Sequence, residues 1–208
     1  MQKSLTKNSI YNVIYTIANI LFPFATSIYV SRILLPAGVG KVASAQNIVS
    51  YFVTLAALGL PSYGVREFAK VREKKYERNK LFTELLLVNI ISTTLAVVGF
   101  IGLVVVNEGF SGQWALYAAC GLSIAFNYLN IDWMYQGLEE YGYITGRSLL
   151  IKGLSLLALF LFVKTREDYV IYALISSLAT GGNYVFNVLN ARKSVSYTHL
   201  RAHETRRH

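Results

Sequence analysis

The chain has little charge, little proline and a single cysteine. Asp, Glu, Lys and Arg make up 15% of its 208 residues, whereas soluble domains carry about 25%. The lone Cys120 excludes an intrachain disulfide, and because no histidine lies near it in the sequence we interpret it as a small packed residue. Hydrophobic residues reach 54% and aromatic residues 13%. This composition is typical of a protein that sits in a lipid bilayer.

Common catalytic motifs are also absent from the sequence. There is no GxxxxGK[ST] phosphate loop, no HExxH, no GxSxG and no CxxC, so ATPase, zinc protease, hydrolase and thiol redox chemistry have no support. We therefore expect a protein that is not an enzyme and that needs no cofactor. The formal net charge is +9, but the cations lie between apolar segments. We interpret them as a topology signal and not as a nucleic-acid surface.

All three histidines lie at the C-terminal end, in SVSYTHLRAHETRRH. His199 and His203 have the i, i+4 spacing of a metal site on a helix. The stretch resembles adapter-derived read-through sequence, so we expect no metal site and predict that 194–208 is a non-native or disordered tail. Residues 1–193 are then the functional unit, and the natural protein is expected to continue beyond it.

Six apolar segments are long enough, or nearly so, to cross a bilayer, which needs roughly 20 residues per helix. They cover 9–30, 39–60, 81–106, 113–135, 148–163 and 169–189. The fifth segment is short and would need interfacial help or little tilt. The sequence predicts an all-α fold, an integral membrane bundle of about six transmembrane helices.

The cations are distributed unevenly between the predicted loops. With the N-terminus in the cytoplasm, the outside segments hold only Arg32, Lys41, Lys164 and Arg166. The inside segments hold Lys3, Lys7, Arg66, Lys70, Arg72, Lys74, Lys75, Arg78, Lys80, Arg147, Arg192 and Lys193. This bias predicts a cytoplasmic N-terminus. The loop 65–80 is interpreted as a solvated, topology-fixing loop or a short surface helix, with contact to anionic lipid headgroups as the functional alternative.

Polar residues follow helical spacing within the apolar segments. They form four faces: Asn8, Asn12, Tyr15, Asn19 and Thr26; Ser44, Asn47, Tyr51 and Thr54; Ser123, Asn127 and Asn130; Ser176, Thr180, Asn183, Asn187 and Asn190. An asparagine amide in lipid needs partners. The faces therefore predict either hydrogen bonds between helices or a water-filled cavity, and spacing alone does not separate the two.

Charged residues within or beside the predicted helices are few. Lys152 lies one turn inside the fifth segment, where it would either snorkel to the interface or face a cavity and meet an anionic group. Asp132, Glu139 and Glu140 cluster near Arg147 at the predicted cytoplasmic end. We interpret this cluster as an interfacial ion-pair network.

Two stretches of the chain are similar to polysaccharide repeat-unit flippases. Residues 31–70, with GLPSYGVREFAK, resemble the first loop, second helix and first cytoplasmic loop of that family, and residues 126–187, with IDWMYQGLEEY, resemble its fourth to sixth helices. The family belongs with the multidrug/oligosaccharidyl-lipid/polysaccharide exporters. The resemblance implies two lobes of about six helices around a central cationic cavity. This chain corresponds to the N-terminal lobe alone, and the fragment is expected to be inactive by itself.

The resemblance also implies the substrate and its partners. The substrate would be an undecaprenyl-diphosphate-linked oligosaccharide repeat unit, carried across the bacterial cytoplasmic membrane for capsule, O-antigen or exopolysaccharide synthesis. Partners would be membrane lipids and a polymerase of the same pathway. Amides match sugar hydroxyls, and cations match a diphosphate. The candidate binding residues are Arg32, Arg66, Arg147, Lys152, Asn19, Asn47, Asn127 and Asn183, with Arg66 and Arg147 predicted to capture the diphosphate at the cytoplasmic mouth.

Three other functions fit the sequence less well. A drug or cation antiporter of the same superfamily would favour carboxylates inside the helices, which are almost absent here. The six-helix membrane subunit of another transporter, such as an ATP-driven exporter, needs longer cytoplasmic extensions. A membrane-embedded glycan synthase or ligase would be expected to carry a catalytic carboxylate or histidine in a loop, and none stands out.

Overall fold

The computed structural model describes the backbone of residues 5–201 and the side chains of 9–191 apart from Ser111. Within that range the chain forms helices and turns and no strand, which confirms the all-α prediction. The helices are α1 Leu5–Ala57, α2 Leu60–Lys70, α3 Lys75–Val106, α4 Glu108–Ser111, α5 Trp114–Phe126, the 3-10 turn η1 Asn127–Leu129, α6 Asp132–Gly137, α7 Tyr141–Phe162 and α8 Tyr169–Arg201. The whole of the predicted tail, 194–208, lies outside the residues whose side chains are described.

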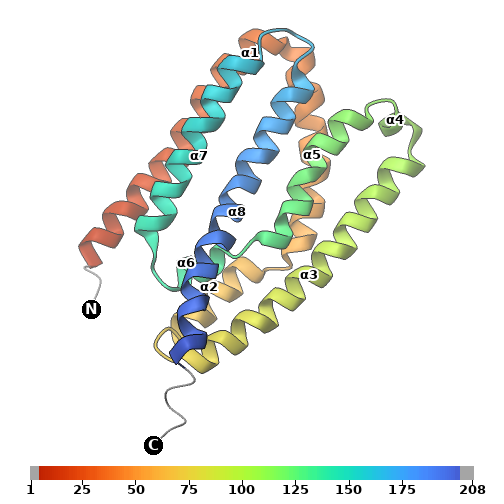
Figure 1. Cartoon of the computed structure of the whole chain (residues 1–208). Helices are drawn as coiled ribbons and strands as arrows, with labels where there is room; N and C mark the ends of the chain where they lie inside the picture. The colour runs from red at the N-terminus through yellow and green to blue at the C-terminus, as the bar shows by residue number, and fades with distance from the viewer. Residues whose placement is uncertain (1–4, 202–208) are drawn as a thin grey trace, which may run out of the picture.

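The long helices lie side by side and run up and down between two ends of a bundle (Figure 1). One end holds α2 and α6, and is here called the α2/α6 end. The opposite end holds α4 and the α7–α8 turn, and is called the α4 end. In that turn the backbone N–H groups of Lys164 and Thr165 donate to Asp168 Oδ2 at 2.9 and 2.7 Å. These bonds lower the pKa of the Asp168 carboxyl below its usual value.

Helix α1 is two predicted helices joined by one non-helical residue. It is 53 residues long, and Leu35 breaks it with φ 57° and ψ 172°. Pro36 follows directly; its ring disfavours a helical conformation at the preceding residue and it has no N–H to continue the hydrogen-bond ladder. The first leg, 5–34, therefore runs toward the α4 end, and the second leg, 36–57, runs back from it (Figure 1).

The prediction of one continuous helix over 113–135 is wrong. Helix α5 ends at Phe126, a 3-10 turn follows, Asn130 is extended, and α6 begins at Asp132. Asparagine side chains compete with the backbone for local hydrogen bonds: the Asn130 Oδ1 accepts from the Asp132 N–H at 3.4 Å. The Trp133 Nε1–H also donates to the Asn130 carbonyl at 3.1 Å. The break thus lies where polar residues supply alternative partners.

Two other predicted segments have different bounds in the structure. The short fifth segment, 148–163, is α7, which begins at Tyr141 and has 22 residues, enough to span about 33 Å. Its first turns were missed because they are polar. The loop 65–80 contains no separate surface helix; it is the end of α2, a turn over 71–74, and the start of α3.

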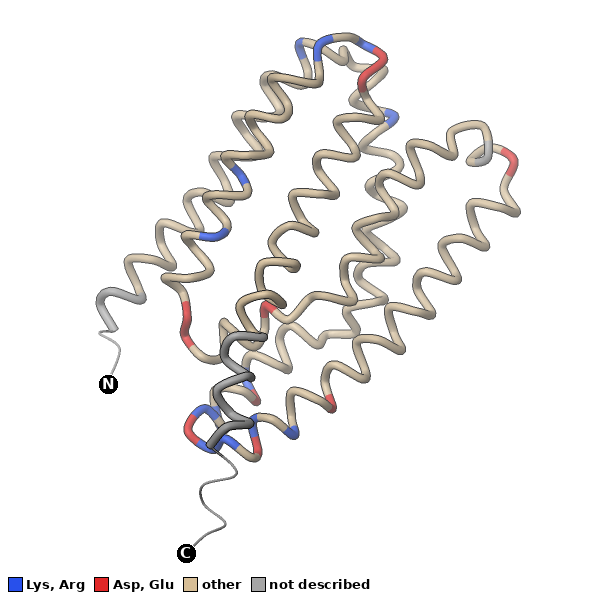
Figure 2. The backbone as a smooth tube through the Cα atoms, viewed as in Figure 1, with Lys and Arg blue, Asp and Glu red and all other residues tan. Residues whose placement is uncertain are grey.

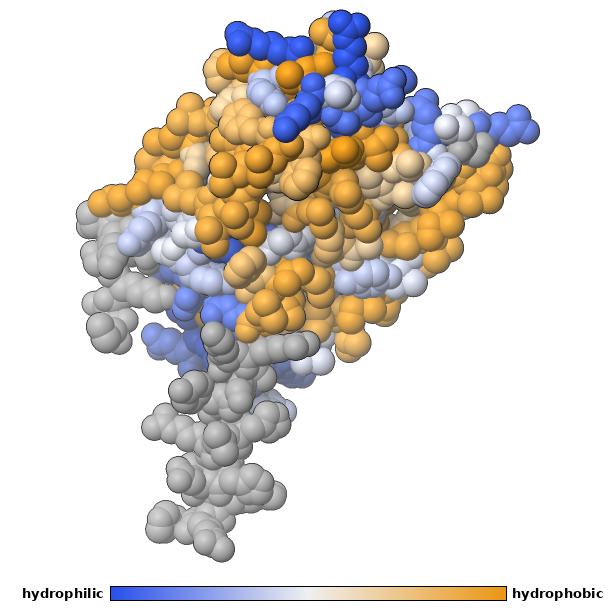
Figure 3. All heavy atoms as spheres, turned by 45° about the horizontal axis from the view of Figure 1, so that its top comes forward, coloured by the Kyte–Doolittle hydropathy of each residue, from blue (hydrophilic) through white to orange (hydrophobic). Residues whose placement is uncertain are grey.

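The surface between the two ends of the bundle is apolar. Figure 2 shows most charged residues at the two ends, and Figure 3 shows a broad hydrophobic belt over the visible face. Among the described residues, three helical stretches are long and apolar enough to cross a membrane: Ser9–Lys70, Lys75–Val106 and Tyr141–Phe162. On α3, Leu95 and Val98 are 69% and 64% exposed. Such a surface is stable in lipid and not in water, so the chain is a multi-pass membrane protein.

Small residues let α2 and α6 approach closely at the α2/α6 end. A methyl group on Gly137 would lie 2.5 Å from Phe68 Cβ and 3.0 Å from the Val65 carbonyl oxygen. The Phe68 and Trp133 rings pack edge to face at 5.1 Å between centroids. The absence of a side chain at Gly137 therefore sets the distance between the two helices.

We expect Gly137→Ala to destabilise the bundle by about 1–3 kcal/mol, because the added methyl group forces α2 and α6 apart. Gly146→Ala is the matched control: nothing lies within 4 Å of the added group on α7, and alanine favours a helix by up to about 1 kcal/mol. The unfolding midpoint of both variants in detergent measures the difference. Equal midpoints would contradict the close packing.

Candidate functional site

A buried arginine joins three segments near the α2/α6 end. Arg147 of α7 donates to Asp132 Oδ1 of α6 at 3.0 Å and also to Asn187 Oδ1 of α8. The Asn187 amide in turn donates to the same Asp132 oxygen. The Arg147 side chain is 3% exposed and that of Asp132 25%. A charge at this depth needs a partner of opposite sign with good hydrogen bonds, and the helix break after α5 places Asp132 where it supplies both.

Two tyrosines extend this cluster along α8. The Tyr135 hydroxyl donates to the Asn187 carbonyl at 2.8 Å and accepts from the Asn190 amide at 3.3 Å. The Tyr143 hydroxyl donates to the Phe186 carbonyl at 2.8 Å. Both bonds reach backbone groups of α8, so α6 and α7 are fixed to the same part of that helix.

A second buried polar cluster surrounds Asn127 at the end of α5. Its amide donates to Asn89 Oδ1 at 3.0 Å and to Thr93 Oγ1 at 2.9 Å. The Asn89 amide donates to the Asn127 carbonyl at 2.7 Å, and the Asn130 amide donates to Asn127 Oδ1 at 3.1 Å. Both N–H donors of the Asn127 side chain are used, and its Oδ1 accepts one bond. The cluster therefore joins α3 to the α5–α6 break by hydrogen bonds between helices.

The two legs of α1 carry polar residues that remain exposed. We define the α1 polar face as Asn12, Thr16, Asn19, Ser27, Ser31, Ser44, Asn47, Ser50 and Thr54, all of which are exposed. Most of the hydroxyls bond to carbonyls of their own helix, namely those of Thr16, Ser27, Ser31, Ser50 and Thr54. Within the described part of the chain, no side chain hydrogen-bonds to the Asn47 amide. Its amide therefore needs water or another protein surface.

Lys152 connects this face to α7. Its Nζ donates to Asn19 Oδ1 at 2.5 Å, and the rings of Tyr15 and Phe22 lie 6.0 and 5.9 Å from the ammonium. No carboxylate of the described residues forms an ion pair with it. Lys152 follows Tyr141 by about 16 Å along the helix axis, at 1.5 Å per residue, so the prediction that it lies one turn inside its helix is wrong. Snorkelling to the α2/α6 end is correspondingly harder.

The structure separates the predicted site residues into an enclosed group and an open group. Asn127 and Arg147 are buried and engaged, and Asn183 is half-buried, with its amide donating to the Ala179 carbonyl. Asn19, Asn47, Arg32 and Arg66 are exposed, and Lys152 is intermediate. Arg66, at the α2/α6 end, donates to Glu67 Oε1 at 3.1 Å. The predicted pair of Arg66 and Arg147 is not brought together, because Arg147 is closed inside the bundle and neutralised by Asp132.

Sequence reasoning missed Asn89 and the hydroxyl of Tyr135 as members of the polar interior. Asn89 is a lone amide in the apolar run of α3, and this isolation is the sequence feature that could have indicated a buried hydrogen bond. Tyr135 carried no signal beyond its residue type. The ion-pair network predicted around Arg147 is confirmed for Asp132, whereas Glu139 pairs with Arg72 at 2.8 Å instead.

This chain is similar to a known protein family and to two curated proteins. The family model described as "Polysaccharide biosynthesis protein" matches residues 5–194. A protein of Escherichia coli (strain K12), named "Putative O-antigen transporter", is 22% identical over 85% of this chain and 42% of its own length. A protein of Shigella dysenteriae with the same name is 27% identical over 74% of this chain and 38% of its own length. No solved structure matches the chain. The chain spans about two fifths of the length of these relatives.

We expect Asp132→Asn to destabilise the chain by about 3 kcal/mol, because it leaves the Arg147 charge buried without a counter-ion. Glu139→Gln removes a carboxylate from the more exposed pair with Arg72 and should cost under about 1 kcal/mol. Thermal or denaturant unfolding of the two variants in the same detergent provides the comparison. If Asp132→Asn lowered the free energy of unfolding no more than Glu139→Gln does, the buried ion pair would not be required for stability.

We also expect Asn127→Ala to cost about 2 kcal/mol, since it leaves Asn89 Oδ1 without its donor and the Asn130 amide N–H without its acceptor. Asn47→Ala, on the exposed α1 polar face, should change the free energy of unfolding by no more than about 0.5 kcal/mol. The same unfolding assay distinguishes an enclosed amide from an open one. Similar values for both would contradict the division into two groups.

Proposed function

The chain belongs to the family of polysaccharide biosynthesis proteins, and on that premise we propose that it is part of a flippase for a lipid-linked oligosaccharide. The substrate is an undecaprenyl-diphosphate-linked repeat unit, which the transporter carries across the bacterial cytoplasmic membrane for O-antigen, capsule or exopolysaccharide synthesis. The names of the two relatives as O-antigen transporters support this proposal. The role is transport and involves no bond making or breaking.

The observation that carries the proposal is the exposed α1 polar face. The rest of the bundle's exposed surface is rich in large apolar side chains, which lipid covers at no cost. On this face the Asn12 and Asn47 side-chain amides, one on each leg of α1, have no hydrogen-bond partner among the described residues. Such exposed amides are costly in lipid and favourable against water or sugar hydroxyls. We propose that this face lines the path of the oligosaccharide headgroup, with Asn19 and Asn47 among the residues that contact it.

Lys152 is the cation best placed to meet the diphosphate. It lies deep in α7, beside Asn19, and no carboxylate of the described residues neutralises it. A diphosphate in a low-dielectric path binds strongly to an ammonium without a counter-ion. Arg32, three residues before the Leu35 break, and Arg66, in α2, are exposed near opposite ends of the bundle. Both are proposed to meet the headgroup as it enters and leaves. Arg147 and Asn127 are proposed to have structural roles.

The orientation proposed for the transporter follows from the charges. The cations of the α2–α3 turn gather at the α2/α6 end (Figure 2), which the positive-inside rule assigns to the cytoplasm. The N-terminal leg begins at that end (Figure 1). We propose that a second unit of similar size covers the α1 polar face and completes the path, so that the chain needs it for activity.

One observation weighs against the antiporter alternative. A carrier of cationic drugs needs a carboxylate that is free to bind them, and the carboxylate inside this bundle, Asp132, is neutralised by Arg147. The cation on the open side, Lys152, favours an anionic substrate instead.

The test is complementation of a flippase-null cell that makes a matched surface polymer. The chain is completed with the C-terminal half of a full-length homologue, and surface polysaccharide is quantified. We expect Lys152→Gln to reduce surface polymer about tenfold or more, because it removes the charge that meets the diphosphate, and Lys152→Arg to retain most of it.

Lys80→Gln is the control, because it removes a cation from an exposed ion pair with Glu84 at the α2/α6 end. Protein levels in the membrane are compared for all variants. Full export by a normally inserted Lys152→Gln variant would overturn the assigned role of Lys152. Absence of export by the unsubstituted hybrid, despite stable insertion, would overturn the flippase proposal itself.

A further inference from the structure

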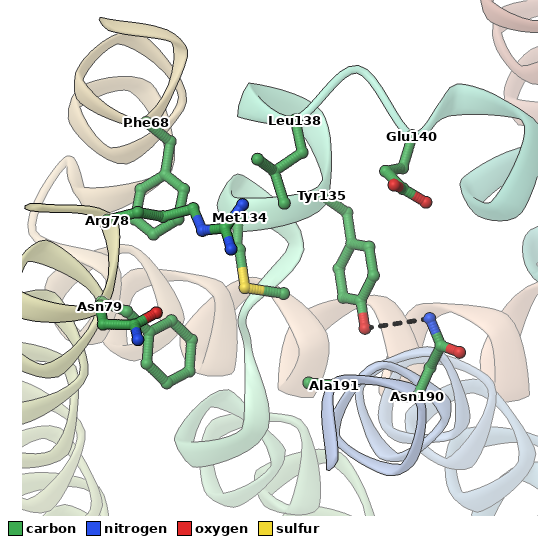
Figure 4. A pocket seen from close by; sticks show the side chains of 10 residues that line it. Phe68, Arg78, Asn79, Met134, Tyr135, Leu138, Glu140, Asn190 and Ala191 are labelled. Carbon is green, nitrogen blue, oxygen red and sulfur yellow. Dashed lines mark hydrogen bonds between the residues drawn. The ribbon is translucent and has the colours of Figure 1, made fainter. Parts of the chain in front are cut away.

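A pocket of about 210 Å³ lies at the α2/α6 end, and no residue of α1 lines it. Residues of α2, α3, α6, α8 and the α6–α7 turn line it (Figure 4). Phe68, Phe82, Met134 and Leu138 supply apolar walls, and Arg78, Asn79 and Asn190 supply polar groups. An apolar cavity with a few convergent polar groups is typical of a binding site for a small amphiphilic molecule.

Arg78 is the cation of this pocket, and it differs from its neighbours on the α2–α3 turn. Arg72 pairs with Glu139, Lys74 with Glu77 and Lys80 with Glu84. Within the described part of the chain, no carboxylate pairs with Arg78 and its side chain makes no hydrogen bond. Arg78 is only partly exposed, and Figure 4 shows its guanidinium extending across the pocket toward Met134.

We propose that this pocket binds an anionic phospholipid by its headgroup. A guanidinium matches a phosphate with two parallel hydrogen bonds, and the neighbouring Asn79 amide adds a donor. The apolar walls receive the glycerol and the first carbons of an acyl chain. Glu140, which also lines the pocket, lies on its far side beyond Tyr135 (Figure 4), so the phosphate belongs at the Arg78 side.

The position of the pocket favours a lipid over a soluble anion. It lies where the apolar belt of the bundle meets a cluster of cations, which is where headgroups sit and where basic side chains attract anionic lipids. A lipid bound there would contact α2, α3, α6 and α8 at once. It would also pack beside Tyr135, whose hydroxyl bonds to the Asn187 carbonyl, and so would brace the buried Arg147 cluster.

The experiment measures thermal unfolding of the full chain in detergent micelles doped with phosphatidylglycerol or phosphatidylcholine. We expect phosphatidylglycerol to raise the midpoint by about 5 °C at saturation, because a ligand of the folded state stabilises it by mass action. Phosphatidylcholine should raise it far less. Arg78→Gln should weaken the phosphatidylglycerol response at least about tenfold in concentration, with an unchanged midpoint in undoped micelles.

Lys75→Gln is the matched control, because Lys75 is exposed on the same turn and does not line the pocket. An equal loss of response in Lys75→Gln and Arg78→Gln would show diffuse attraction and overturn the site. Inorganic phosphate at millimolar concentration distinguishes the source of the anion: the same shift with phosphate alone would overturn the assignment to a lipid. If Arg78→Gln does not fold, Arg78→Lys with native mass spectrometry of retained phosphatidylglycerol replaces it, and undiminished retention would contradict the proposal.

Discussion

A guanidinium enclosed between helices must be neutralised and hydrogen-bonded where it lies, and this requirement fixes the α2/α6 end of the bundle. Asp132 and Asn187 neutralise and bond Arg147 at Nη1, and each comes from a different segment, whereas the buried Arg147 Nε has no hydrogen-bond partner among the described residues. Asp132 reaches the arginine only because α5 stops at Phe126 and the chain restarts as α6. The helix break, the ion pair and the attachment of α6 and α7 to α8 therefore depend on one another. Removing any one of the side chains involved leaves a buried polar group unpaired.

This arrangement divides the polar residues of the bundle into two classes with different consequences. Asn89, Asn127 and Asn187 are buried and bonded between segments, so they stabilise the fold and are not open to a ligand. The α1 polar face and Lys152 form the second class, because some of their polar groups have no hydrogen-bond partner or counter-ion within the described chain. In a membrane such groups must find water, protein or substrate. The bundle thus combines a closed polar interior with an open polar face, and only the second is suited to a moving headgroup.

The sequence predicted the all-α membrane bundle because apolar runs of about 20 residues constrain the chain strongly. The predicted bounds of the fourth and fifth segments were wrong because Asn130 interrupts the fourth segment and polar residues such as Thr145 lie in the first turns of α7, where hydropathy carries little information. The polar faces were recognised by spacing, but spacing did not distinguish Asn127, which is buried, from Asn47, which is exposed; that distinction depends on which neighbouring helix covers each face. Likewise, the charge of Arg147 was visible in the sequence, whereas its pairing with both Asp132 and Asn187 required the fold.

Cysteine accessibility in intact membranes tests the division into closed and open polar groups most directly. Cys120 is first replaced by alanine, and single cysteines are placed at 47, at 127 and at the lipid-facing position 95. A membrane-impermeant maleimide is then applied from either side, because it reacts with thiols that water reaches. The account predicts labelling of Asn47→Cys and none of Asn127→Cys or Leu95→Cys. Labelling of Asn127→Cys, or an Asn47→Cys as unreactive as Leu95→Cys, would contradict it.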